Sequence, residues 1–344
     1  MRIALHYCAP TLSPMGLRVA LGICGALEEG GIEPQVLVAE PAAAPGLRTH
    51  AYDPAITAPW TAVWQRNWRL PLGLRVQLAR QPVDVLLCVD QPGDLAIARL
   101  ALGYQTEVAL ISWLPGLEGA EASLAQYADL HLAPSRAHAA RLRALPDPQR
   151  PVALAPRPVP QLGRLPGPRT GVRLLWIGLP DEAGGLHLLL EALRRLPSDW
   201  SLAVGSVDLV DAADINRAVH WSEADRCSLL PAGDPWSAVD CASLCVVTSD
   251  RGSETAAIAE AVARGLPVVA AAGATGARDL LEGDAALPLD PGEMAGALSA
   301  AKRQGLPDIA RRQGQRARAA RRTAAGRLLE ALSYLPPQRK GVRP

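Results

Sequence analysis

The sequence predicts an α/β protein of two lobes, each holding a parallel sheet covered by helices on both faces. Short apolar runs and helix-like periodic runs alternate twice along the 344 residues, and such alternation is typical of parallel α/β sheets. The strand-like runs are apolar throughout, which indicates strands buried on both faces. A proline-rich stretch separates the two series, so we expect two domains of ordinary size.

The first lobe is predicted over residues 1–156. It opens with a strand, a Pro/Gly loop and a periodic helix that a pair of glycines ends. Further helices are expected near 94–102 and over 135–145. The strands expected in this lobe are RIALHY, EPQVLVA, VDVLLCVD, EVALISW, DLHLA and PVALA.

A linker is predicted over 157–170, because five prolines fall within 156–170 and the stretch has no periodicity. The second lobe is predicted over 171–314, with helices at 185–196 and around Glu260. Its expected strands are VRLLWIG, WSLAVGS, SLCVVTS, LPVVAAA and AALPL. Ligands of such sheets bind beyond the carboxyl ends of the strands, so we expect a site in the cleft between the lobes.

The overall charge points to neither nucleic acid nor an acidic substrate. Lys and Arg number 35 against 34 Asp and Glu, and the formal net charge is +1. The six cysteines form no CxxC pair, which favours reduced thiols over disulfides or zinc. Proline breaks the N-terminus too early for a signal peptide, and no apolar run reaches 18 residues, so a cytoplasmic protein is expected.

The stretch SDRGSETAAIAEAVARGLPVVA (249–270) is the most informative part of the chain. A loop after a strand leads into a helix, whose free N–H groups and positive dipole end favour a diphosphate. A glutamate on that helix, Glu260, is suited to accept hydrogen bonds from two ribose hydroxyls. The structural alternatives are a chance surface glutamate for Glu260 and a dipole-favoured terminal charge for Glu254. The six histidines lie apart in the sequence and form no metal or catalytic motif.

Two surface-type patterns leave alternatives open. Residues 302–327 hold nine Lys or Arg at roughly helical spacing, which favours a solvated helix face over a contact with anionic lipid headgroups. Trp60, Trp64 and Trp68 repeat every four residues after Pro59, as in a buried stripe. An acceptor-side or membrane-interface surface is the alternative, because two arginines stand among them.

These features together resemble the retaining nucleotide-sugar glycosyltransferases of family 4, which have the GT-B fold. The similarity runs over almost the whole chain, and AEAVARGLPVVA is its most specific piece. The other similar segments are MRIALHYCAPTLSPMGLRVALGICGALEEGG, ADLHLAPSRAHAARLRAL, IGLPDEAGGLHLLLEAL and RRTAAGRLLEALSYL. The resemblance implies metal-independent, retaining transfer of a sugar to a glycan, lipid or small molecule, with no cofactor besides the donor. It also implies that residues 315–344 form a closing helix and tail that pack toward the first lobe.

The resemblance implies one catalytic residue, Glu254, and Trp113 on the acceptor side. The nucleotide-sugar ligands that it implies are Gly16, Gly178, Ser249, Arg251, Glu260, Thr275, Gly276 and Asp279. No metal ligand is expected.

The sequence departs from the family pattern where the family holds the diphosphate. Leu179 and Gly184 stand where the family has an Arg and a Lys, and Trp113 follows Ser112 where a His is common. Gly252 lies eight residues before Glu260, so Glu254 matches the family's first glutamate only if the loop is two residues shorter. Arg251 is the candidate for the missing cation. The alternative function is a GT-B protein without donor chemistry that serves as a binding subunit or as the partner of an active transferase, with a peripheral membrane contact also open.

Overall fold

The structure is a computed structural model, and the chain divides into two compact units. Unit 1 comprises Met1–Pro158 and Ala320–Pro344, and unit 2 comprises Val159–Ala319. The first break therefore lies two residues after the predicted end of the first lobe at 156. The residues that the structure describes are 1–7, 14–38, 49–51, 62–89, 93–103, 108–113, 119–145, 150–178, 185–206, 224–231, 234–248, 254–272, 274, 278–281 and 286–335.

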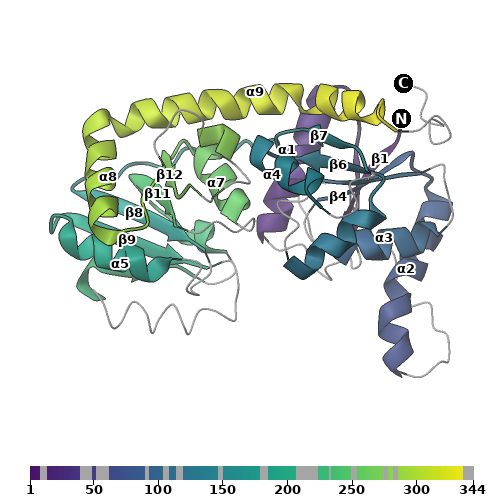
Figure 1. The fold of residues 1–344 in the computed structure, drawn as a ribbon, viewed down its shortest axis with the longest axis horizontal. Helices are drawn as coiled ribbons and strands as arrows, with labels where there is room; N and C mark the ends of the chain where they lie inside the picture. Colours follow the sequence, from purple (N-terminus) through teal and green to yellow (C-terminus); the bar gives the residue numbers. More distant parts are fainter. Residues whose placement is uncertain are drawn as a thin grey trace. The chain divides into compact units, whose positions relative to one another are not determined.

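Unit 1 is built on a seven-stranded parallel sheet in the order β3-β2-β1-β4-β5-β6-β7 (Figure 1). The strands are β1 (Ile3–Tyr7), β2 (Gln35–Val38), β3 (Thr49–Ala51), β4 (Val85–Cys88), β5 (Ala109–Ser112), β6 (Leu130–Ala133) and β7 (Val152–Leu154). All but β3 match predicted strands. Most of their side chains are buried, as expected for parallel strands covered on both faces.

Helices cover both faces of the first sheet. One face packs against α1 and the end of α9, and the other packs against α2, α3, α4 and η1. These elements are α1 (Pro14–Glu29), α2 (Ala62–Arg80), α3 (Gly93–Leu102), the 3-10 helix η1 (Gly119–Tyr127), α4 (Arg136–Arg143) and α9 (Leu306–Leu332). The predicted helix over 135–145 is α4, and Ser135 caps it by accepting a hydrogen bond from the His138 amide at 3.1 Å.

Unit 2 holds a five-stranded parallel sheet in the order β10-β9-β8-β11-β12. Its strands are β8 (Val172–Ile177), β9 (Trp200–Gly205), β10 (Cys227–Leu229), β11 (Leu244–Val247) and β12 (Val268–Ala270). Its other elements are α5 (Leu186–Arg195), η3 (Ala224–Arg226), η4 (Pro235–Ala238), α7 (Glu254–Ala263), η5 (Arg278–Leu281) and α8 (Pro291–Gln304). Helices α5 and α8 cover one face, while α7 contacts β11 and β12. The predicted strand AALPL is reduced to a single bridge between Ala271 and Leu287.

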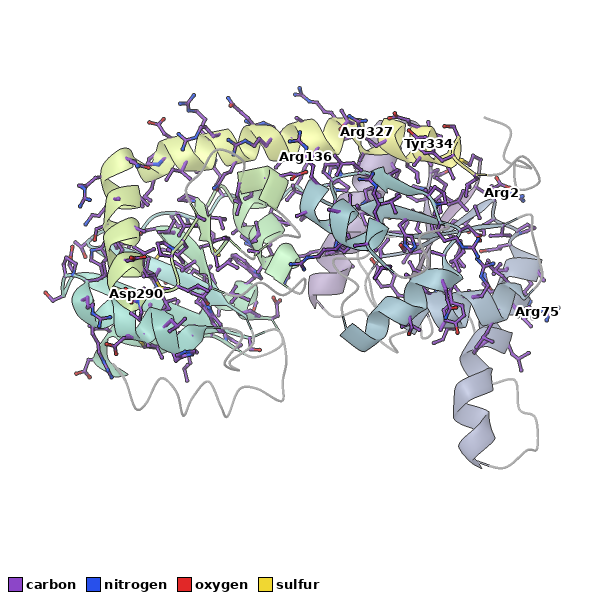
Figure 2. The ribbon with its side chains drawn as sticks, in the orientation of Figure 1. Arg2, Arg75, Arg136, Asp290, Arg327 and Tyr334 are labelled. Carbon is purple, nitrogen blue, oxygen red and sulfur yellow. The ribbon has the colours of Figure 1, made fainter. Side chains whose placement is uncertain are left out.

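The C-terminal helix differs from its prediction. It begins at Leu306, nine residues before the expected start at 315, and directly follows α8. Asp290 caps α8 through the amides of Gly292 and Glu293 (Figure 2), and Gly305 ends it with a φ of +95°. Helix α9 then runs from unit 2 into unit 1 at Ala319/Ala320. In the part of the chain that the structure describes, no helix is both long and apolar enough to span a membrane.

The two sheets share a topology that fixes where ligands can bind. In each sheet the first strand in sequence, β1 or β8, lies inside the sheet between its second and fourth strands. The strand order therefore reverses between β1 and β4, and again between β8 and β11. Connections leave such a pair toward opposite faces and open a crevice beyond the carboxyl ends of the two strands.

Candidate functional site

In unit 2 the crevice lies beyond Gly178 and Thr248, which follow β8 and β11. Both residues are buried. The Gly178 amide donates to the Gly205 carbonyl at 3.2 Å, and the Trp176 indole Nε1 donates to the Thr248 hydroxyl at 2.8 Å. These bonds hold the ends of three neighbouring strands in place. The sequence prediction placed Gly178 at the donor site, and the structure places it at this edge.

Gly185 brings the start of α5 against the end of β11. Its φ is +67°, and a Cβ there would lie 2.9 Å from the Thr248 Cβ. Gly185 is the N-cap of α5 and makes no side-chain cap hydrogen bond. The first amides of a helix have no partner within the helix, so this helix start favours an anion.

Helix α7 starts at Glu254, six residues after Thr248 at the end of β11. Two helices, α5 and α7, thus follow the two strands that flank the crevice, and each presents a positive dipole end at the carboxyl edge of the sheet. This arrangement is suited to a phosphate or diphosphate group. Ser249 and Arg251 lie outside the described residues, as does the side chain of Glu254.

Glu260 is buried within unit 2, with 2% of its surface exposed. The Arg264 guanidinium donates to its Oε1 from Nη2 at 2.9 Å and from Nε at 3.2 Å. The Trp236 ring lies 5.2 Å from the Arg264 Cζ, within cation–π range. The interpretation of Glu260 as a chance surface glutamate is therefore wrong. Its ribose role stays a prediction.

Of the other predicted ligands, Asp279 lies half-buried in η5. Thr275 and Gly276 fall outside the described residues. Gly16 was expected in a loop before the first helix, but α1 begins at Pro14 and holds Gly16 in its first turn. Proline fits the first helical position, because its missing N–H has no partner there and its φ is already helical.

Trp113 has the environment of a core residue. Its side chain is fully buried among the apolar residues of unit 1, and its indole donates to the Ala155 carbonyl at 2.8 Å. Its acceptor-side role stays a prediction, and no exposed surface of the indole supports that role.

Unit 1 carries a buried polar row near the carboxyl edge of its sheet. His6, Cys88, Ser112 and His131 are partners in register across β1, β4, β5 and β6. Ser112 Oγ lies 2.5 Å from His131 Nδ1, and Cys88 Sγ lies 4.0 Å from His6 Nδ1. Burial lowers the pKa of His6 to about 3 and that of His131 to about 4, and raises the pKa of Cys88. The row therefore consists of neutral groups near pH 7.

The basic run at 302–327 lies on α8 and α9. Arg311 pairs with Asp308 and Arg327 with Glu330, both on α9, and Arg321 pairs with Glu29 of α1. Lys302 Nζ on α8 also lies 3.8 Å from Asp199 Oδ2. At least four of the nine charges thus have acidic partners, which supports a solvated helix face. Among the described residues, no three His, Cys, Asp or Glu side chains are grouped as metal ligands.

The sequence alone did not predict the contacts of Glu260 with Arg264 and of Arg264 with Trp236, nor the polar row of unit 1. Arg264 could have been noticed, because a glutamate followed by an arginine four residues later is a favourable helical pair. Trp236 carries no such signal, since it lies 28 residues from Arg264 and meets it only in the fold. The same holds for the polar row, whose members share no sequence motif.

Solved structures with the same fold include nucleotide-sugar enzymes, while no protein-family model and no curated protein matches the chain. The Anabaena protein HepE, in complex with UDP and glucose and also with UDP-glucose, is 16% identical with a TM-score of 0.71, covering 97% of this chain and 100% of HepE. Sucrose-phosphate synthase from Thermosynechococcus elongatus is 16% identical with a TM-score of 0.71, and the match covers 97% of this chain and 98% of the synthase. The UDP-GlcNAc 2-epimerase from Neisseria meningitidis, bound to UDP-GlcNAc, is 13% identical with a TM-score of 0.61. The match covers 97% of this chain and 100% of the epimerase. With its two Rossmann-like units, the chain has the GT-B fold.

Proposed function

We propose that the protein is a glycosyltransferase that moves a sugar from a UDP-sugar to a hydroxyl of a glycan, lipid or small-molecule acceptor. The observation that carries the proposal is the reversal of strand order between β8 and β11 in unit 2, the two strands that α5 and α7 follow. The fold shared with HepE, solved with UDP-glucose, supports UDP as the nucleotide. The buried carboxylate of Glu260, on one of these two helices, supports a ribose contact.

In this proposal the diphosphate lies at the starts of α5 and α7, beside Gly178. Glu260 accepts hydrogen bonds from the ribose hydroxyls, and charge-assisted bonds of this kind are about twice as strong as neutral ones. Glu254, at the first position of α7, stands closest to the transferred sugar. The remaining proposed contacts to the donor come from Gly16, Ser249, Thr275, Gly276 and Asp279.

The reaction breaks the bond between the sugar and the diphosphate and forms a bond from the sugar to the acceptor oxygen, and the leaving diphosphate takes up the proton of the acceptor hydroxyl. We propose that it proceeds with retention and without a metal. The leaving diphosphate then needs positive charge, and the absence of one such donor costs roughly 3 kcal/mol of transition-state stabilisation. Leu179 and Gly184 supply no cation, so the proposal assigns this role to Arg251, whose planar guanidinium can bind two phosphate oxygens.

The test combines calorimetry with UDP and UDP-glucose and an assay of UDP release over a panel of acceptors. We expect UDP to bind and Arg251→Ala to lower turnover roughly tenfold or more. The melting temperature should hardly change, because an arginine in the predicted loop contributes little to folding. Arg303→Ala, on the exposed face of α8, is the matched control and should keep full activity. The anomeric configuration of the first product, read by NMR, tests retention.

A catalytically inactive partner protein is the second candidate, and the missing arginine and lysine at Leu179 and Gly184 favour it. If the protein turns over no donor and binds no nucleotide, the result decides for this candidate. Wild-type activity in Arg251→Ala would instead remove only Arg251 from the mechanism. Our proposal locates the activity in the cytoplasm, and flotation with vesicles of anionic lipid tests a peripheral membrane contact.

A further inference from the structure

Unit 2 contains two glutamate–arginine pairs of the same helical spacing and very different burial. Glu191 and Arg195 on α5 are 41% and 48% exposed, with 3.1 Å between Arg195 Nη2 and Glu191 Oε1. Glu260 and Arg264 on α7 are 2% and 18% exposed, with 2.9 Å between the corresponding atoms. An exposed pair of this kind contributes little to stability. A buried carboxylate, by contrast, loses its hydration and needs compensation inside the protein.

Both hydrogen bonds from Arg264 converge on one oxygen of Glu260. Nη2 and Nε donate to Oε1 at 2.9 Å and 3.2 Å. Two donors in a rigid planar fork fix the orientation of the carboxylate more firmly than a single rotatable ammonium would.

Arg264 is itself held from several sides. Its guanidinium lies over the Trp236 ring at 5.2 Å, and Trp236 is buried in η4. Its backbone carbonyl accepts from the Leu165 amide at 3.0 Å, and its amide donates to the Glu260 carbonyl at 3.0 Å. The next residue, Gly265, has a φ of +71° and lies against the Arg164 side chain. The guanidinium thus starts from a fixed backbone and rests on an aromatic surface.

We propose that Arg264 is a positioning residue, which holds the Glu260 carboxylate in one orientation for the ribose hydroxyls of the bound nucleotide. This inference rests on the proposed function, because it takes the ribose contact of Glu260 from there. In this proposal Arg264 contacts neither the sugar nor the phosphate, so its effect reaches the ligand only through Glu260. Removing it should weaken the ribose contact and leave the other contacts of the nucleotide unchanged.

The experiment measures the affinities of UDP and of 2′,3′-dideoxy-UDP, which lacks both ribose hydroxyls, by calorimetry. We expect Arg264→Met, which keeps the aliphatic stem, to weaken UDP binding tenfold or more. The dideoxy ligand should bind wild type and Arg264→Met within threefold of each other, since it offers Glu260 nothing to bind. Arg264→Lys should recover part of the loss, because it restores the charge without the fork. Arg195→Met, at the exposed pair of α5, is the matched control and should bind both ligands as wild type does.

Three results would overturn the inference. If Arg264→Met loses affinity equally for UDP and for the dideoxy ligand, Arg264 has a structural role only. If Arg264→Met binds UDP as tightly as wild type or more tightly, Arg264 does not position Glu260. In both cases wild type still binds UDP, so the proposed function stands. Wild type that binds no UDP overturns the ribose assignment and the proposed function together.

A second variant guards against poor folding of Arg264→Met, which removes the arginine partner of a buried carboxylate. Glu260→Gln with Arg264→Met removes both charges. It should bind UDP as Glu260→Gln alone does, because Arg264 acts only through the carboxylate. A double variant that binds UDP more than threefold weaker than Glu260→Gln contradicts the proposal.

Discussion

Gly185 has a backbone conformation that side chains rarely adopt, at the point where β8 leads into α5. Its φ is +67°, and an added Cβ would lie 2.9 Å from the Thr248 Cβ. A left-handed conformation costs a residue with a side chain about 1–2 kcal/mol, and the close contact adds to this. We therefore expect Gly185→Ala to lower the free energy of unfolding by about 2 kcal/mol or more, measured by urea denaturation.

Gly296 provides the matched control for Gly185→Ala. It lies inside α8, where an added Cβ would meet nothing within 4 Å. Alanine is a better helix former than glycine, so Gly296→Ala should raise the free energy of unfolding by roughly 0.5–1 kcal/mol. If both variants shift the urea midpoint in the same direction, the strain assigned to Gly185 is wrong.

At the residue scale, sequence reasoning found positions more readily than contacts. It selected Glu260, because a glutamate on a helix after a buried strand is a recognisable pattern. It did not show that Arg264 binds this carboxylate and rests on the Trp236 ring, because Trp236 reaches the helix only through the fold. His6 and His131 were taken as isolated, yet strand register aligns both in one polar row. Register between parallel strands depends on tertiary packing and leaves no local mark in the sequence.

Helix α9 protects an edge of the second sheet through one side chain. Among the described residues, β12 is the last strand of that sheet, and beyond it lies a single bridge between Ala271 and Leu287. Gln313 is fully buried there, accepts from the Val268 amide at 2.9 Å and donates to the Val268 carbonyl at 2.8 Å. Its amide thus takes the place of a neighbouring strand at an edge that would otherwise invite pairing.

Replacing Gln313 by leucine should leave both Val268 backbone groups buried without this partner. Each such group costs about 1–3 kcal/mol, so we expect Gln313→Leu to lower the free energy of unfolding by at least 2 kcal/mol. Gln315→Leu is the control, because Gln315 lies exposed on the same helix and should change stability by less than about 0.5 kcal/mol. Equal denaturation midpoints for the two leucine variants would contradict the role of Gln313.

At the element scale, the predicted elements are those with long and pure patterns. The buried strands β1, β4, β8 and β11 are apolar runs between turn signals, and each was found near its observed bounds. Strands β3 and β10 were missed, because their sequences, THA and CSL, are not apolar throughout, whereas the equally short edge strands β7 and β12 lie within longer apolar runs. The start of α9 was placed late, since its first turn carries Pro307 and follows a glycine, which are features of a loop as much as of a helix start.

At the scale of the whole molecule, the two units differ in their buried imidazoles. Among the side chains that the structure describes, three buried histidines occur, and all lie in unit 1: His6, His131 and His138. Burial lowers the pKa of each, to about 3, 4 and 4 respectively, and Arg141 and Arg157 add a smaller repulsion at His138. Unit 2 has the exposed His187 and no buried histidine in its described part.

This difference predicts that acid unfolds unit 1 before unit 2. The folded-state pKa values of these histidines lie below the ordinary 6.5. Below pH 6.5 their imidazoles therefore bind more protons in the unfolded chain than in the folded chain. The stability that neutral imidazoles give is complete above pH 6.5 and is lost as the pH falls toward 4, by up to about 1.4 kcal/mol per pH unit for each histidine. Hydrogen exchange read by mass spectrometry between pH 7 and 4 should show peptides of unit 1 losing protection first. His138→Gln should reduce the slope by about a third, and simultaneous loss of protection in both units, or an unchanged slope, would contradict the assignment.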